Sequence, residues 1–348
     1  MDDKHLGLRF SYHIYKSRKI KYRLFDQYKD LAIEKYPPGL IELLFLDECN
    51  SFLEKEFQLC SKHNYHLLSY LDKEYPSSIQ HFKNMPPCLY VEGEIPRKES
   101  AIAIVGSRKA SPYGLSLAYS FSKELSDMNK VVISGLAYGI DTQAHQGALA
   151  GSGKTVAVLG CSLEHSYPKS NQNLRNNIVK EGAVISEFPL GTPPAPYLFP
   201  VRNRIISALC QSVLVVEAAE KSGALITVDY ALDQGKEIYA IPGNINSSLS
   251  KGTNQLIKNG ANICTCVSDL FPSEEASLFP KSVKKQNSSD TESNSLESNV
   301  LTILEATPLT TSEIIEKSLG GPSETLHAIT MLELNGEIAL ISGKYIKL

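Results

Sequence analysis

The chain has 348 residues, of which 42% are hydrophobic and 21% charged, so it has enough apolar material for more than one folded core. Its 35 Lys and Arg residues against 38 Asp and Glu give a formal net charge of −3. This balance excludes a protein that coats nucleic acid with a uniformly basic surface, but it is compatible with a local basic groove. The 22 glycines and 18 prolines exclude a collagen-like or low-complexity chain.

The seven cysteines are odd in number and scattered, which predicts free thiols in a reducing compartment. Cys264 and Cys266 form the only close pair in the sequence, and no second Cys or His pair lies near it, so we expect no metal site. The charged N-terminus is not followed by the apolar core of a signal peptide, and no stretch is long enough to span a membrane. We therefore expect a cytoplasmic protein without cofactors and without a membrane partner.

Residues 1–98 combine helical periodicity with aromatic residues, as in 20–31 and 40–46, and Pro37 and Pro38 interrupt the pattern. They predict a small helical N-terminal module followed by a connector.

Residues 99–271 differ, because short apolar runs alternate there with longer segments of helical type. The runs are 101–105, 131–133, 155–159, 183–185, 212–216 and 237–241. Strands without polar alternation are buried on both faces, as in a parallel sheet covered by helices. We therefore predict an α/β fold whose core is an extended Rossmann-like, doubly wound, mostly parallel sheet. Its ligands are expected at the carboxyl ends of the strands.

Residues 272–295 are rich in Ser, Asn and charged residues and predict a flexible linker, because this composition cannot bury a core. Residues 296–348 predict a winged helix-turn-helix from three amphipathic stretches and two β-like pieces. These segments are 296–306, 311–318, 323–334, 339–341 and 345–348.

The predicted recognition helix of this domain, residues 323–335, contains no Lys or Arg, and residues 291–348 hold eight acidic residues against three lysines. Because phosphate contacts dominate DNA affinity, we expect this surface to repel a duplex. A protein-interaction or dimer-supporting role is favoured.

The turn after the first predicted strand contains Gly106, Ser107, Arg108 and Lys109. Glycine lets backbone N–H groups approach an anion, and the serine hydroxyl, the guanidinium and the positive end of the next helix would all favour a phosphate. The alternative is an ordinary turn with solvated charges. The place of Arg108 at the carboxyl edge of a strand favours phosphate binding.

A second candidate segment, residues 196–206, joins a proline-stiffened loop to a helix start. It carries Phe199, Arg202, Asn203 and Arg204. Residues i and i+2 do not share a helix face, so one arginine can face a pocket and the other the interior. Aromatic rings beside arginines are typical of single-stranded nucleic-acid binding. The alternative is that Phe199 belongs to the core and the arginines pair with Glu187 or Glu217.

Gly223 opens a further predicted helix, whose N-terminus suits an anion or is a plain packing turn. Two enzyme signatures are rejected. Residues 151–155 end like a P-loop, but Ala148 replaces its first glycine and a strand follows instead of a helix. Ser134, Asp141 and His145 could form a hydrolytic triad, but no nucleophile-elbow sequence surrounds the serine, so helix capping and core packing are favoured.

Taken together, a series of motifs in one order and spacing resembles the DNA-processing protein A (DprA/Smf) family over about residues 65–265. The motifs are Ile104–Arg108, Ser134–Asp141, Ala144–Leu149, Phe199–Ile206, Val215–Ala218, Ser222–Thr227, Ile241–Gly243, Gly252–Ile257 and Gly260–Ala261, with Tyr75–Pro76 and Leu89–Gly93 upstream.

The resemblance implies a homodimer that binds single-stranded DNA without sequence preference and without hydrolysing it. It further implies that the protein protects incoming DNA, loads the RecA recombinase onto it in natural transformation and recombination, and displaces or bypasses single-strand-binding protein. The family's binding pocket maps onto Gly106, Ser107 and Arg108 and onto the loop of Phe199, Arg202 and Arg204. Some relatives carry a lysine just before that phenylalanine; this chain has none, and Lys169 is the expected substitute. The expected DNA-binding set also includes Lys109, Asn203 and Gly223.

Two other functions are weaker alternatives. A nucleotide-processing phosphoribohydrolase on a related Rossmann-like fold would carry a Pro-Gly-Gly-x-Gly-Thr turn, but residues 222–227 lack its glycine pair. A ligand-sensing winged-helix transcription regulator is disfavoured by the acidic recognition helix.

Overall fold

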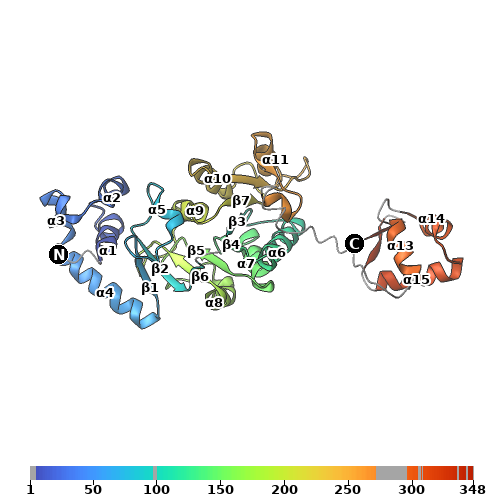
Figure 1. The fold of residues 1–348 in the computed structure, drawn as a ribbon, viewed down its shortest axis with the longest axis horizontal. Coiled ribbons are helices and arrows are strands. Elements are labelled where there is room, and N and C mark those ends of the chain that lie inside the picture. Colours follow the sequence, from blue (N-terminus) through green and yellow to red (C-terminus); the bar gives the residue numbers. More distant parts are fainter. Residues whose placement is uncertain are drawn as a thin grey trace. The chain divides into compact units, whose positions relative to one another are not determined.

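A computed structural model describes two compact units, residues 1–279 and 280–348 (Figure 1). The residues it describes are 5–96, 100–271, 296–304, 307, 309–334, 337–341 and 344–347. The predicted linker, residues 272–295, lies outside this set.

The first unit is built on a nine-stranded sheet in the order β1-β2-β6-β5-β4-β3-β7-β8-β9. The six predicted strands are its parallel centre: β3 (Ala101–Val105), β4 (Val131–Ser134), β5 (Thr155–Val158), β6 (Ala183–Ser186), β7 (Ser212–Val215) and β8 (Glu237–Ala240). Every residue of β3 to β7 is buried, which explains why these runs carry no polar alternation. The mostly parallel, Rossmann-like sheet is therefore confirmed.

Three further strands were not anticipated from the sequence. β1 (His66–Ser69) and β2 (Cys88–Gly93) form an antiparallel pair, and β2 runs antiparallel to β6, with Tyr90 opposite Ser186. The two-residue β9 (Asn262–Ile263) pairs with β8. The connector after the helical module thus belongs to the sheet, and it lies in the same compact unit.

Helices cover both faces of the sheet. They are α6 (Pro112–Asp127), α7 (Ile140–Ala150), α8 (Gln172–Glu181), α9 (Leu198–Leu209), α10 (Gly223–Asp233) and α11 (Lys251–Lys258). β3 shows the two layers, because Ile102 and Ile104 pack with α6 and α7, whereas Ala103 and Val105 pack with α9 and α10.

The N-terminal module consists of several helices, of which α4 has 17 residues, and a π-helical turn. They are α1 (Leu6–Ser11), the turn Tyr12–Lys16, α2 (Tyr22–Tyr28), α3 (Pro38–Leu44) and α4 (Asp47–His63), with α5 (Ser77–Gln80) between β1 and β2. The rings of Phe10, Phe25 and Tyr70 meet edge to face, with centroids 5.1 and 5.0 Å apart. They belong to the apolar cluster that continues under the sheet, so the described part of the module shares its core with the sheet.

The second unit has its own apolar core and a winged-helix arrangement. Its elements are α13 (Leu296–Leu304), α14 (Thr311–Lys317), α15 (Pro322–Leu334) and the antiparallel pair β10 (Ile338–Ile341) and β11 (Lys344–Lys347). Thr310 and Glu313 form a capping box at the start of α14. The winged helix-turn-helix prediction is confirmed.

Across the described residues, no helix has the length and apolar character needed to cross a membrane.

Candidate nucleic-acid interface

The turn between β3 and α6 is fixed by Glu217, which follows β7. The Ser107 N–H donates to the Glu217 carbonyl at 2.8 Å, and the Glu217 carboxylate accepts from the Ser111 N–H at 2.9 Å and from its hydroxyl at 2.5 Å. Ser111 in turn caps α6 by accepting from the Gly114 N–H at 3.1 Å. These bonds hold the turn while the side chains of Arg108 and Lys109 remain exposed.

The loop after β4 supports the same turn. Gly139 has a φ of 75°, and a Cβ at this position would lie 2.9 Å from the Arg108 carbonyl carbon and closer still to the Ser107 oxygen. The Ile140 N–H donates to the Ser107 carbonyl at 3.2 Å. Glycine is needed here because the two backbones touch and the conformation is left-handed.

A small cavity of about 110 Å³ lies between this turn and the starts of α9 and α10. It is lined by six of the ten residues expected from the sequence: Gly106, Arg108, Phe199, Arg202, Asn203 and Gly223. A second, smaller hollow adjoins it and is lined by Arg108, Tyr138, Tyr167 and Phe199, among others. Residues far apart in the sequence thus meet at the carboxyl edge of the sheet, as expected for a doubly wound fold.

Phe199 is half-buried at the centre of this site. Its ring packs on Gly160, where a Cβ would come within 2.6 Å of the ring's Cδ1 atom. The Arg108 guanidinium carbon lies 5.2 Å from the ring centroid, and the Tyr167 ring lies 5.2 Å away at 33°. Within the described part of the chain, the Arg108 guanidinium has no hydrogen-bond or ion-pair partner. We call this group the Arg108–Phe199 site.

Arg202 forms a buried wall of the site, with only 3% of its surface exposed. One guanidinium nitrogen donates to the Gly135 carbonyl at 2.8 Å and to the Val158 carbonyl, so it joins the ends of β4 and β5. Burial lowers the pKa of Arg202 to about 10, although Asp141 acts in the opposite direction. Arg202 therefore shapes the cavity and brings a positive charge to it.

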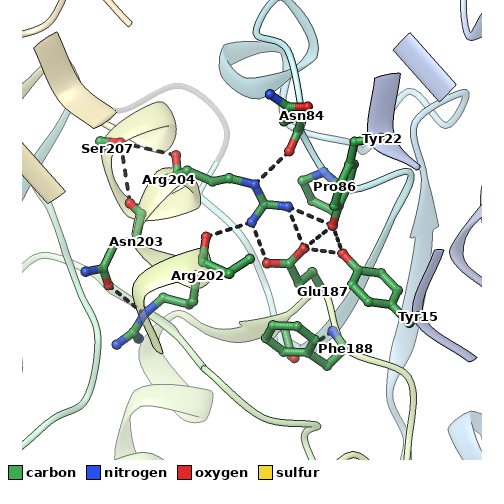
Figure 2. Close-up of polar contacts among 12 residues, drawn as sticks. Tyr15, Tyr22, Asn84, Pro86, Glu187, Phe188, Arg202, Asn203, Arg204 and Ser207 are labelled. Atoms are coloured by element: carbon green, nitrogen blue, oxygen red, sulfur yellow. Dashed lines mark hydrogen bonds and ion pairs between the residues drawn. The ribbon is translucent and has the colours of Figure 1, made fainter. Parts of the chain in front are cut away.

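Arg204 points to the opposite side of α9 and is 4% exposed (Figure 2). It donates to both carboxylate oxygens of Glu187, at 2.5 and 2.6 Å, to the Tyr22 hydroxyl at 2.9 Å and to the Asn84 carbonyl at 2.7 Å. Burial by itself lowers the pKa of Arg204, but Glu187 outweighs it and raises the pKa. Arg204 therefore forms the ion pair with Glu187 that the sequence offered as an alternative. Its buried guanidinium is not available for the expected DNA contact.

The remaining expected residues lie around the site. The Ser107 hydroxyl oxygen accepts from the Lys109 N–H at 3.1 Å and does not line the cavity. Lys169 is exposed on the loop after β5, which Asn171 ties to the Leu136 carbonyl at 3.1 Å. The Asn203 side-chain amide donates to the Gly223 carbonyl at 3.4 Å. Gly223 is exposed at the first turn of α10.

The hydrolytic triad weighed from the sequence is not assembled. The Ser134 hydroxyl donates to the Ile104 carbonyl at 2.6 Å, and His145 Nδ1 lies 2.7 Å from the Thr155 hydroxyl. The Asp141 carboxylate accepts from the Gly135 N–H at 3.1 Å. Each side chain thus serves the local structure, and burial lowers the pKa of His145 to about 3.

Sequence reasoning missed two residues of the site, Tyr138 and Tyr167. Both are exposed, and each lies on a loop that follows a parallel strand, β4 or β5. The signal in the sequence that could have found them is an aromatic residue on a loop that follows an apolar strand. Among the described residues, no group of three or more His, Cys, Asp or Glu side chains could hold a metal ion.

The family model "DNA recombination-mediator protein A" matches residues 66–274, and the model "DprA winged helix domain" matches residues 284–344. Protein Smf of Escherichia coli (strain K12) is 36% identical over 301 residues, which is 84% of this chain and 80% of that protein.

Two solved structures are also similar. The structure of DNA processing protein A from Streptococcus pneumoniae has a TM-score of 0.62 at 33% identity and covers 78% of this chain and 97% of that one. A structure of DNA processing protein A from Helicobacter pylori, whose title describes a single-stranded DNA binding mode, has a TM-score of 0.53 at 28% identity. It covers 59% of this chain and 93% of that one.

Proposed function

Because the chain belongs to the DNA recombination-mediator protein A family, we propose that its Arg108–Phe199 site binds single-stranded DNA without hydrolysing it. The observation that carries the proposal is the exposed Arg108 guanidinium, which lies over the half-buried Phe199 ring and has no carboxylate partner in the described part of the chain. A ring for stacking beside a cation for phosphate is the arrangement that single-strand binders use. The description of the Helicobacter pylori relative supports the same ligand.

Binding is independent of base sequence in this proposal. An aromatic ring can stack on the face of any base. The guanidinium group of an arginine and the ammonium group of a lysine contact phosphate, which is the same in every nucleotide. The 16-residue helix α6 begins beside the turn and adds its positive end to the site. We propose that the bound strand is protected and handed to the RecA recombinase in transformation and recombination, with displacement of single-strand-binding protein.

The protein acts as a homodimer in this proposal. The β9 end of the sheet supports it, because this edge strand is only two residues long and its Ile263 side chain is 55% exposed. Apolar side chains at an exposed sheet edge favour association with another chain.

The test is a titration of the full chain with single-stranded and duplex oligonucleotides at several salt concentrations. Single strands should bind far more tightly, with a slope of log affinity against log salt of about −0.7 for each phosphate contacted. Arg108→Ala should weaken single-strand binding by about 1.5 to 3 kcal/mol, because a charge-assisted hydrogen bond to phosphate is lost.

Lys180→Ala is the matched control. Lys180 is an exposed cation in the last turn of α8, which leads into the amino end of β6 and so lies at the opposite edge of the sheet. This variant should bind like the wild type. Equal affinity for both forms of DNA, or an Arg108→Ala variant that binds as tightly as the wild type, would contradict the proposed site.

A further inference from the structure

A short segment of the N-terminal module, residues 16–23, concentrates positive charge. It joins the π-helical turn to α2, and its exposed cations are Lys16, Arg18, Lys19, Lys21 and Arg23. No acidic residue interrupts them, whereas residues 24–65 hold four lysines against eight acidic residues. Within the described residues, these five side chains have no hydrogen-bond or ion-pair partner. We call this segment the basic loop.

Tyr15 and Tyr22, at the two ends of the basic loop, hold it in place (Figure 2). Both hydroxyls donate to the Glu187 carboxylate, Tyr22 at 2.7 Å, and Tyr22 also accepts from Arg204. Between them, Ile20 is buried in the core and its N–H donates to the His13 carbonyl at 3.2 Å. The loop is thus fixed at three points while its cations face solvent, so a ligand would not need to order it.

The basic loop is attached to Glu187, and this residue places the loop at the same edge of the sheet as the Arg108–Phe199 site. Glu187 follows β6 directly, and the parallel strands continue in the order β6, β5, β4, β3. The carboxyl ends of parallel strands share one edge, where Tyr167 follows β5, Tyr138 follows β4 and Arg108 follows β3. Along this edge, the loop bearing Tyr167 lies between the basic loop and Arg108.

We propose that the basic loop is a second phosphate-binding segment, which takes the continuation of the single strand bound at the Arg108–Phe199 site. The inference rests on the proposed function for the identity of the ligand. Five cations on an ordered loop can contact several phosphates without reading bases. The chain's net charge is negative, so this concentration of cations marks where a polyanion is attracted.

The test compares two triple variants of the full chain that remove the same charge. The first is Lys19→Gln, Lys21→Gln and Arg23→Gln, in the basic loop. The control is Lys35→Gln, Lys55→Gln and Lys62→Gln, which are exposed elsewhere in the N-terminal module. Each is titrated with fluorescent oligo-dT of about 6 and about 25 nucleotides, a range that spans known single-strand site sizes.

The basic-loop variant should bind the longer strand about tenfold more weakly, and its salt slope should flatten by about 2, as expected when three phosphate contacts are lost. It should bind the shorter strand like the wild type, because that strand fills only the Arg108–Phe199 site. The control variant should match the wild type on both strands.

An unchanged affinity and salt slope for the longer strand would overturn the inference, as would equal losses in the two triple variants or equal losses on the two strands. The proposed function is judged separately, by the wild type and by Arg108→Ala on the shorter strand. If wild-type protein binds no single strand, the proposed function fails. If the wild type binds single strands and Arg108→Ala weakens that binding, but the basic-loop variant binds the longer strand like the wild type, the inference alone fails.

Discussion

Two arginines of this protein lie against aromatic rings at nearly the same distance but in opposite surroundings. The Arg108 guanidinium carbon is 5.2 Å from the Phe199 centroid, and that of Arg204 is 5.1 Å from the Tyr22 centroid. Arg204 is buried and bound to Glu187, whereas Arg108 is exposed beside a cavity. The same pair of side-chain types thus makes a structural link in one place and an open binding surface in the other.

The carboxylates explain the difference. Glu187 is turned toward Arg204 and neutralises it inside the protein, where an uncompensated charge would be costly. Glu217 follows the strand next to β3 and lies close to the Arg108 turn, but its carboxylate is taken by the N–H and hydroxyl of Ser111. Arg108 keeps its charge available for a ligand because the nearby acid is used to cap a helix.

The largest effect should come from breaking the buried pair. Arg204→Ala should lower the free energy of unfolding by about 3 to 5 kcal/mol, because Glu187 is left buried without its cation. Chemical denaturation measures this difference. Arg108→Ala, at an exposed side chain, should leave the stability within about 0.5 kcal/mol of the wild type. Equal stabilities of the two variants would remove the distinction between the sites.

A smaller effect should separate stacking from charge within the Arg108–Phe199 site. Phe199→Ala should weaken single-strand binding by about 1 to 3 kcal/mol with little change in salt slope, because no phosphate contact is lost. Tyr197→Ala, a change at an exposed ring two residues earlier, is the control and should bind like the wild type. If Phe199→Ala lowers only the melting temperature, the ring belongs to the core and does not stack on DNA.

The smallest effect should come from removing one hydroxyl group from the hydrogen bonds around Arg204. Tyr22→Phe removes one hydroxyl that donates to Glu187 and accepts from Arg204, and should cost about 0.5 to 1.5 kcal/mol of stability. Binding of a short oligonucleotide should not change. Melting curves and a titration of the same sample would show both, and a loss of short-strand affinity would connect this link to the Arg108–Phe199 site.

The sequence by itself determined the centre of the fold. Six apolar runs without polar alternation became six parallel buried strands, because both faces of that sheet are covered by helices. Amphipathic stretches in the sequence predicted the winged helix, and the motifs at the predicted turns and helix starts supplied six of ten expected residues that line one cavity. β1 and β2 were missed because runs of four and six residues are too short to show a clear period.

Only the tertiary structure decided which of the two buried arginines of α9 lines the cavity and which forms an ion pair. Spacing showed that Arg202 and Arg204 leave α9 on different faces, but it could not show that Glu187, Tyr22 and the Asn84 carbonyl converge on Arg204. Spacing also could not show that Tyr138 and Tyr167 belong to the site. The place of the basic loop beside β6 was hidden as well, because it depends on Tyr15 and Tyr22 reaching Glu187 across more than 160 residues of chain. Local patterns fix what a segment can become, whereas its charge partners come from parts of the chain that only folding brings together.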